Sequence, residues 1–359
     1  MSLKSNIFCL GLGSAGGKLY KKMLDFQYKG AAGNGSEQDL KALGDVPSKF
    51  RLQGFDGFGG HRDKAVDCLA ENEEFLDFVA SIKEEIVFVL FGGGGSTGSG
   101  CAAPVIETLL EERDESGYPK KIVCPVIALP SSNEAIIKHR NAYQAVLELQ
   151  DLDGIGATFF IRNDVSEDYE YINATFTKML DAFLSNESVG ETNNFDTSEK
   201  KEMLRNSGAF VLSLFGSGKD PKLMLDKLTQ DGIFAPIEED KVCENIAIVH
   251  AGRDSRDITD SDVIAEVGKP GNVFEGFNGK QTVIAVSGLT YPVSYVSKLG
   301  ELAQEAFKER QRNRKSSVKK LGVLSFMETE PEKPDIQNKP KKASKLDMIK
   351  KMQAMRENQ

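Results

Sequence analysis

Apolar residues occur in short runs that alternate with amphipathic segments through the first half of the chain. Four runs are predicted to be strands, at residues 7–12, 86–91, 122–129 and 158–161. Apolar residues recur at helical spacing after these runs, as at residues 102–113. Strands that alternate with helices predict an α/β fold with a parallel sheet covered on both faces. Ligands of such sheets bind at the carboxyl ends of the strands.

A long amphipathic segment, residues 168–185, predicts a helix that divides the chain. Beyond it, further apolar runs predict strands at residues 210–215, 246–251 and 282–289. We therefore predict five parts: a Rossmann-like N-terminal domain at 1–167, a central helix at 168–187, a smaller C-terminal α/β domain at 188–291, a long C-terminal helix at 292–320 and a flexible basic tail at 321–359.

Charge is divided unevenly along the chain. The whole sequence has a formal net charge of −9, whereas the residues from Lys308 onward contain 15 basic and 7 acidic side chains. An acidic body with a basic tail indicates a negatively charged partner for the tail, and a solvated tail without a partner is the alternative. The last stretch, residues 345–359, places apolar side chains at helical intervals among lysines, as an amphipathic helix that docks on a partner would: Leu346, Ile349, Met352 and Met355.

Composition excludes several classes of protein. The sequence contains no apolar run of about 18 residues, so no membrane span is predicted. The N-terminal residues lack the pattern of a signal peptide. Five scattered cysteines without a CxxC pair are typical of buried thiols in a reducing compartment. We therefore expect a cytoplasmic protein.

Residues 92–100 (GGGGSTGSG) follow a predicted strand and precede a predicted helix. Consecutive glycines cost backbone entropy and offer no side chain to bury. Their use is a tight turn whose N–H groups point inward, and next to a helix N-terminus such a turn binds phosphate. The loop is therefore the first candidate for a ligand site, and a merely flexible loop is the alternative.

Another glycine loop, residues 11–17 (GLGSAGG), follows an earlier predicted strand; in chain order it is the first glycine loop and residues 92–100 are the second. Alone, the first loop matches the dinucleotide fingerprint of an NAD-dependent oxidoreductase. That reading requires a second strand ending near an acidic residue, and the region at 29–40 is a poor strand by its apolar pattern. Two glycine loops on different strands suit a triphosphate better, and the sequence has no complete Walker motif.

The sequence at residues 94–100 (GGSTGSG) resembles the signature GGGTG[ST]G of the tubulin/FtsZ superfamily, with Ser96 in place of a glycine. The similarity continues in order: residues 34–40 (NGSEQDL), 57–63 (GFGGHRD), 129–143 (LPSSNEAIIKHRNAY) and 161–164 (IRND) resemble successive nucleotide loops of that family. The resemblance implies a GTPase that binds GTP or GDP and forms filaments.

The resemblance also implies which residues bind the nucleotide. It places Tyr169 or Ile172 against the base, Glu134 at the ribose and Arg140 near the base. It also places Asn163 near the sugar or base and Asn173 on the guanine edge. The full implied set is Gly13, Ser14, Ala15, Gly16, Asn34, Gly94, Gly95, Ser96, Thr97, Gly98, Ser99, Glu134, Arg140, Asn163 and Asn173.

Residues 194–199 (NFDTSE) resemble the family loop that enters the nucleotide site of the next subunit. By this resemblance Asn194, Asp196 and Glu199 would act on the neighbour's GTP, with Glu199 orienting the attacking water. Asp196 or Ser198 would also suit the N-cap of the following helix. The sequence has no cluster of metal ligands, so Mg²⁺ is expected to be held mainly by the phosphates and water.

The tail most resembles that of TubZ, the partitioning tubulins of plasmids and phages. In that family a C-terminal region engages TubR, a DNA-bound adaptor. The resemblance therefore implies a filament that segregates DNA through such an adaptor. A division protein of the FtsZ type and a phage-positioning tubulin are the alternatives, and an NAD-dependent oxidoreductase is a distant one.

Overall fold

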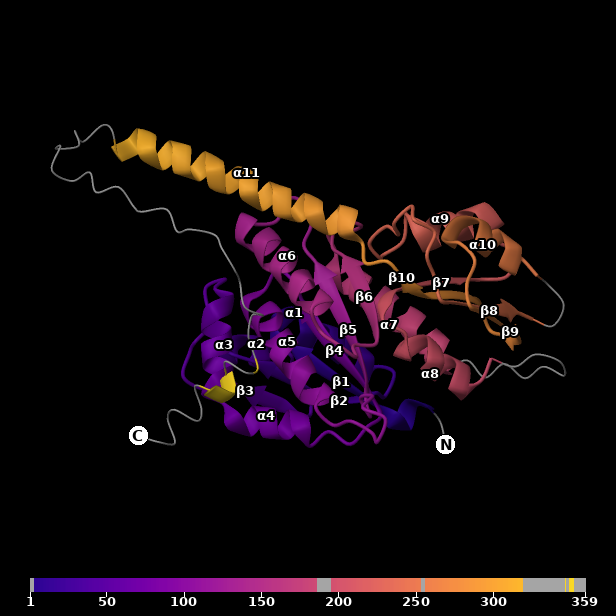
Figure 1. Cartoon of the computed structure of the whole chain (residues 1–359), viewed down its shortest axis with the longest axis horizontal. Helices are drawn as coiled ribbons and strands as arrows, with labels where there is room; N and C mark the ends of the chain where they lie inside the picture. The colour runs from indigo at the N-terminus through magenta and orange to yellow at the C-terminus, as the bar shows by residue number, and fades with distance from the viewer. Residues whose placement is uncertain (1–2, 186–194, 253–255, 319–345, 347–348, 352–359) are drawn as a thin grey trace.

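The structure is a computed structural model that describes residues 3–185, 195–252, 256–318, 346 and 349–351. Strands and helices alternate through the first half (Figure 1). Its strands are β1 (Ile7–Leu12), β2 (Lys29–Asn34), β3 (Lys49–Arg51), β4 (Ile86–Gly92), β5 (Ile122–Leu129) and β6 (Ala157–Arg162). Its helices are η1 (Leu3–Asn6), α1 (Gly13–Leu24), α2 (Glu37–Ala42), α3 (Arg62–Ala70), α4 (Glu73–Ala80), α5 (Ser96–Leu110) and α6 (Ile136–Gln150). The six strands pair in parallel in the order β3-β2-β1-β4-β5-β6.

The second half begins with the long helix α7 (Tyr169–Ser185), which packs against α1 and β7. The remaining elements are α8 (Thr197–Arg205), β7 (Gly208–Phe215), α9 (Pro221–Thr229), β8 (Asn245–Ala251), α10 (Asp260–Val267), β9 (Asn272–Gly279), β10 (Thr282–Leu289) and α11 (Val293–Val318). Strand β7 extends the sheet in parallel from β6, and β10 lies antiparallel between β7 and β8. The predicted α/β class, with its largely parallel sheet, long central helix and second α/β unit, is confirmed.

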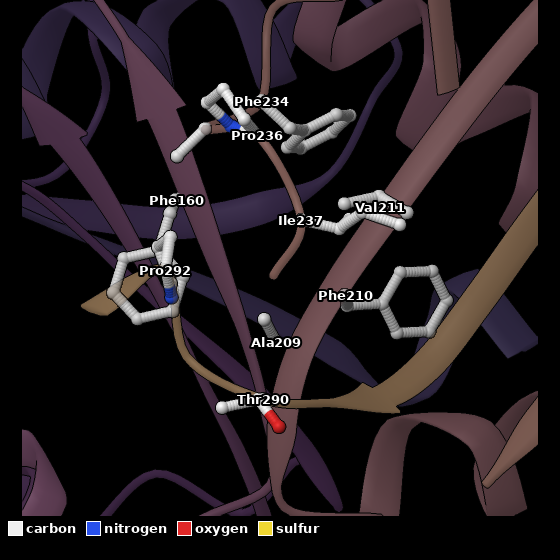
Figure 2. Close-up of a pocket in the computed structure, with 10 residues that line it drawn as sticks. Phe160, Ala209, Phe210, Val211, Phe234, Pro236, Ile237, Thr290 and Pro292 are labelled. Carbon is white, nitrogen blue, oxygen red and sulfur yellow. The ribbon is translucent and has the colours of Figure 1, made fainter. Parts of the chain in front are cut away.

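The two halves meet in an apolar junction between β6 and β7. Phe159 stacks against Phe210 with ring centroids 4.8 Å apart, and Phe160 meets Tyr291 edge-on at 4.7 Å. Figure 2 shows the small gap that remains beside Phe160. Its volume of about 10 Å³ is room for roughly one water molecule. The halves are therefore joined through a packed core.

Two elements differ from the expectation in ways that concern the site. Helix α1 begins at Gly13, directly after β1, and α5 begins at Ser96, whereas the apolar pattern indicated a start near residue 102 for the latter helix. The first turns of both helices consist mainly of glycine and serine, so no apolar pattern marks where each helix begins. The weak run at residues 29–34 is the strand β2. A Cβ on Gly30 would lie 2.0 Å from the carbonyl oxygen of Cys9, so small residues are required here and they hide the strand pattern.

Helix α11 crosses from the C-terminal half along α6 (Figure 1). Within the described residues, which include all five cysteines, the thiols are buried and no disulfide forms. No helix of the described part of the chain has an apolar stretch long enough to cross a membrane.

Candidate functional site

A cavity of about 360 Å³ lies at the carboxyl ends of β1, β4 and β5. Its walls come from the starts of α1 and α5, from α2, from the loop before α6 and the first turn of α6, and from the residue after β6 and the first turns of α7. The polar and glycine residues that line it are Gly13, Ser14, Lys18, Asp39, Gly92, Gly94, Gly95, Ser96, Thr97, Gly98, Glu134, Lys138, Asn163, Tyr169 and Asn173. Leu12, Ala15, Ala128 and Pro130 complete the wall. The structure thus brings both glycine loops to one cavity.

The N-termini of α1 and α5 both open onto this cavity. In the part of the chain that the structure describes, neither helix has a side-chain cap or an acidic residue in its first turn, because Leu12 and Gly95 occupy the N-cap positions. The first N–H groups of a helix lack intrahelical partners and carry the positive end of its dipole. Two such ends beside Ser14 and Thr97 form a site for an anion with several oxygens.

Glycine is required where the two loops touch. Gly13 has a φ of +71°, and a Cβ there would lie 3.0 Å from the backbone nitrogen of Gly98. A Cβ on Gly98 would in turn lie 3.0 Å from the carbonyl oxygen of Leu12. Close backbone approach therefore places the N–H groups of both loops around one volume.

Another part of the cavity wall is built around Glu134. Its carboxylate accepts hydrogen bonds from Ser131 N–H at 3.0 Å and from Asn163 Nδ2 at 3.4 Å, and it pairs with Lys138 at 2.6 Å. Burial raises the pKa of Glu134, but Lys138 and these donors outweigh burial and hold the pKa below its usual range. The ionised carboxylate is therefore a fixed acceptor for a hydroxyl group at the cavity wall.

Helix α7 supplies an aromatic and an amide group. Tyr169 is 45% exposed and lines the cavity with Asn173, one turn further along the helix. Ile172, the other residue considered for packing against a ring, is 1% exposed and belongs to the core. Of the two, Tyr169 is therefore the side chain available to a ligand.

Four residues of the predicted nucleotide-binding set lie outside the cavity wall. Gly16 packs against β4, where a Cβ would be 2.0 Å from the carbonyl oxygen of Leu90. Asn34 is buried behind the wall, and its Nδ2 donates to Asp39 at 3.2 Å. Ser99 is buried as well, and Arg140 lies in a separate groove between α6 and α11.

Buried Arg62 of α3 supports the second glycine loop from behind. Its Nε donates to Ser99 Oγ at 3.0 Å, and its guanidinium pairs with Glu148 of α6 at 2.6 Å. Ser99 Oγ in turn donates to the carbonyl oxygen of Gly95. Ser99 and Arg62 therefore act on the loop by positioning it.

Sequence reasoning missed three charged residues of the cavity: Lys18, Asp39 and Lys138. Lys18 directly follows the first glycine loop, one helical turn after Ser14, and Lys138 lies four residues after Glu134. Both are predictable from helical spacing once the starts of α1 and α6 are known. Asp39 lies inside residues 34–40, one of the segments that resemble the nucleotide loops of the family.

Asp196 and Glu199 lie at the N-terminus of α8. Asp196 is the N-cap, as expected, and its Oδ1 accepts from Ser198 N–H at 2.7 Å. Glu199 Oε2 accepts from Asp196 N–H at 2.8 Å, which completes a capping box. Asn194 lies outside the described residues.

Helix α8 is on the edge of the sheet opposite the cavity. Lys201 pairs at 2.6 Å with Glu85, which precedes β4, and the Cys124 thiol near the start of β5 donates to the carbonyl oxygen of Leu204. Strand β4 has seven residues and so separates the two edges by roughly 20 Å. The structure therefore does not bring Asp196 and Glu199 to the cavity of their own chain.

Among the described residues, no group of three or more His, Cys, Asp or Glu side chains is placed to hold a metal ion. Asp39 and Glu134 are the two carboxylate side chains among the described residues that line the cavity.

The sheet order, the long central helix and a cavity formed by two glycine-rich helix starts give this chain a fold similar to that of solved tubulin-like proteins of the TubZ type. This confirms the predicted resemblance. No protein-family model matches the chain.

Similarity to TubZ covers nearly the whole chain. The chain is 23% identical to the tubulin-like protein TubZ of Clostridium botulinum C phage over 361 residues, an alignment that covers 97% of both chains. The solved structure of tail-truncated Clostridium botulinum phage c-st TubZ is similar with a TM-score of 0.74 at 23% identity, covering 86% of this chain and 99% of that chain. A GTPγS-form protofilament of Bacillus thuringiensis serovar israelensis TubZ gives a TM-score of 0.69 at 15% identity, covering 86% and 94%.

Proposed function

We propose that this protein binds and hydrolyses GTP and polymerises head to tail into filaments. The observation that carries the proposal is the cavity in which the uncapped N-termini of α1 and α5 meet across Gly13 and Gly98. Such a site binds phosphate through backbone N–H groups and helix dipoles.

We expect the nucleotide to lie in the cavity in one orientation. Its phosphates would lie on the two helix starts, with Lys18 and Lys138 as nearby cations. The ribose would reach Glu134, whose ionised carboxylate accepts from hydroxyl groups. The base would then lie against Tyr169, with the Asn173 amide donating to and accepting from the guanine edge.

Mg²⁺ suits this arrangement as a partner of the phosphates. It prefers oxygen ligands and retains several of its waters. With Asp39 as an acidic oxygen donor in the wall, the phosphates and water would supply most of the ligands. When bound, the cation would neutralise charge that develops on the phosphates.

Hydrolysis is proposed to require two subunits. Asp196 and Glu199 project from the edge of the sheet opposite the cavity, so stacking one subunit on the next would bring them to the neighbour's phosphates. A carboxylate that orients water provides the positioning that phosphoryl transfer needs. The TubZ of Bacillus thuringiensis serovar israelensis, with the same fold, has been solved as a GTPγS-form protofilament.

The proposed biological role is segregation of DNA. The basic C-terminal tail would engage a DNA-bound adaptor resembling TubR, because a protein–DNA complex presents a strong negative field. Near full-length similarity to a phage TubZ supports this role over cell division or phage positioning. The filament would act in the cytoplasm of a bacterial host.

The decisive experiment measures GTP hydrolysis and light scattering against protein concentration. A split site predicts that both rise together above a threshold concentration, with little hydrolysis below it. Hydrolysis strictly proportional to protein concentration would contradict the split site. Thermal protection by NAD(H) with none by GTP would contradict the nucleotide assignment and favour an oxidoreductase.

A further inference from the structure

A groove of about 430 Å³ lies at the C-terminal end of α5, on the N-terminal half of the molecule. Two acids come from α5 and its C-cap, Glu107 and Glu111, and two from the segment after α6, Asp151 and Asp153. The apolar side chains of Leu110 and Leu152 complete it, and Arg113 lies at its border. An acidic groove with an apolar floor suits a basic amphipathic peptide.

The C-terminal segment of the same chain is seated at this groove. Leu346 lines the groove with 6% of its surface exposed, and Ile349 is fully buried in the main core cluster. Leu346 N–H donates to Glu107 Oε2 at 3.1 Å, and Lys350 pairs with Glu111. Figure 1 shows this short yellow segment against the N-terminal half, remote from the end of α11. Contacts of both kinds, apolar and ionic, hold the segment there.

The C-terminal end of helix α5 favours a nearby positive charge. Its last turn has the sequence ETLL and so contains an acid and no basic residue. The carbonyl groups at a helix C-terminus carry partial negative charge. Lys350 therefore offsets both the Glu111 carboxylate and the helix dipole.

We infer that this groove is the docking site of the chain's own C-terminal segment in the free subunit. The occupant is the stretch that contains Leu346, Ile349 and Lys350, bound within one chain. The Lys350 and Glu111 side chains are each about half exposed, so the ionic contact is screened and reversible. Any external partner of this segment must consequently compete with the groove for the same residues.

The test is carbodiimide coupling of the full-length protein, which joins an ammonium and a carboxylate only where they touch. Chains labelled with ¹⁴N and ¹⁵N are mixed equally below the concentration at which light scattering rises. Mass spectrometry should find a Lys350–Glu111 link in isotopically uniform pairs. Absence of that link, or links between differently labelled chains, would overturn docking within one chain.

A matched pair of variants tests whether the apolar contact holds the segment. Ile349→Ser leaves both coupled groups in place and should lower the yield of the link by about tenfold or more, because the buried side chain is lost. Lys351→Ser, two residues away and exposed, should change the yield by no more than about twofold. Equal yields from wild type and Ile349→Ser would refute the docking site.

Discussion

At the scale of single residues, the capping role of Glu199 and its proposed catalytic role can be separated by substitution. Its carboxylate completes the capping box of α8 and is also proposed to orient water in the neighbouring subunit. Glutamine can accept the same backbone hydrogen bond, because a capping box accommodates Glu or Gln. The two roles therefore respond differently to Ala and Gln.

Glu199→Ala and Glu199→Gln should both slow GTP turnover by about 100-fold or more, since both remove the carboxylate. Assembly should persist and the filaments should last longer. Only Glu199→Ala should also destabilise the fold, by about 1 kcal/mol, because the cap is lost. Turnover is measured by phosphate release and stability by urea unfolding. A glutamine variant with wild-type turnover would show that the carboxylate does not act on water.

Glu134 is predicted to make stability depend on pH. Its folded pKa is lowered, so it stabilises the native state above its unfolded pKa of about 4.3, and the effect disappears as pH falls through the folded pKa. Glu134→Gln should therefore be less stable than wild type at pH 7, and the difference should shrink below about pH 4. Urea unfolding at several pH values measures this. A difference that is constant with pH would contradict the prediction.

At the scale of elements, the second glycine loop depends on three helices. Arg62 of α3 connects Ser99 of α5 to Glu148 of α6 behind the loop. The loop is thus braced by buried polar contacts even though its glycines contribute no packing.

Arg62→Met should destabilise the protein by about 3 kcal/mol, because a buried ion pair loses one partner. It should also weaken GTP binding, since the carbonyl oxygen of Gly95 and the hydroxyl of Ser99 lose their support. Lys41→Met is the control: its pair with Glu37 is exposed, so less than about 0.5 kcal/mol should be lost. Chemical unfolding and nucleotide titration measure both effects. Equal stability of the two variants would exclude the bracing role.

At the scale of the whole molecule, the cavity and α8 occupy opposite edges of one sheet. A subunit with complementary functional groups at two ends is suited to polar, head-to-tail assembly. The packed junction between β6 and β7 joins the two halves of the chain through a common core.

Removing residues 321–359 should leave concentration-dependent GTP hydrolysis intact, because the described walls of the cavity and α8 all precede this segment. It should weaken binding to an adaptor–DNA complex, and the remaining binding should depend less on salt. A pulldown at two salt concentrations measures this. Undiminished binding by the shortened chain would exclude the tail as the adaptor contact.

The sequence by itself determined the fold class, the course of most strands and the position of both glycine loops. These features are local, because apolar periodicity and runs such as GGGGSTGSG report the conformation of their own segment. Only the tertiary structure decided which residues share the cavity. Arg140 faces α11 and Gly16 faces β4, whereas Lys18 and Asp39 reach the cavity, because small shifts in where a helix begins rotate side chains to another face. The sequence likewise could not predict that the segment with Leu346 and Ile349 docks at α5, because this contact joins segments more than two hundred residues apart.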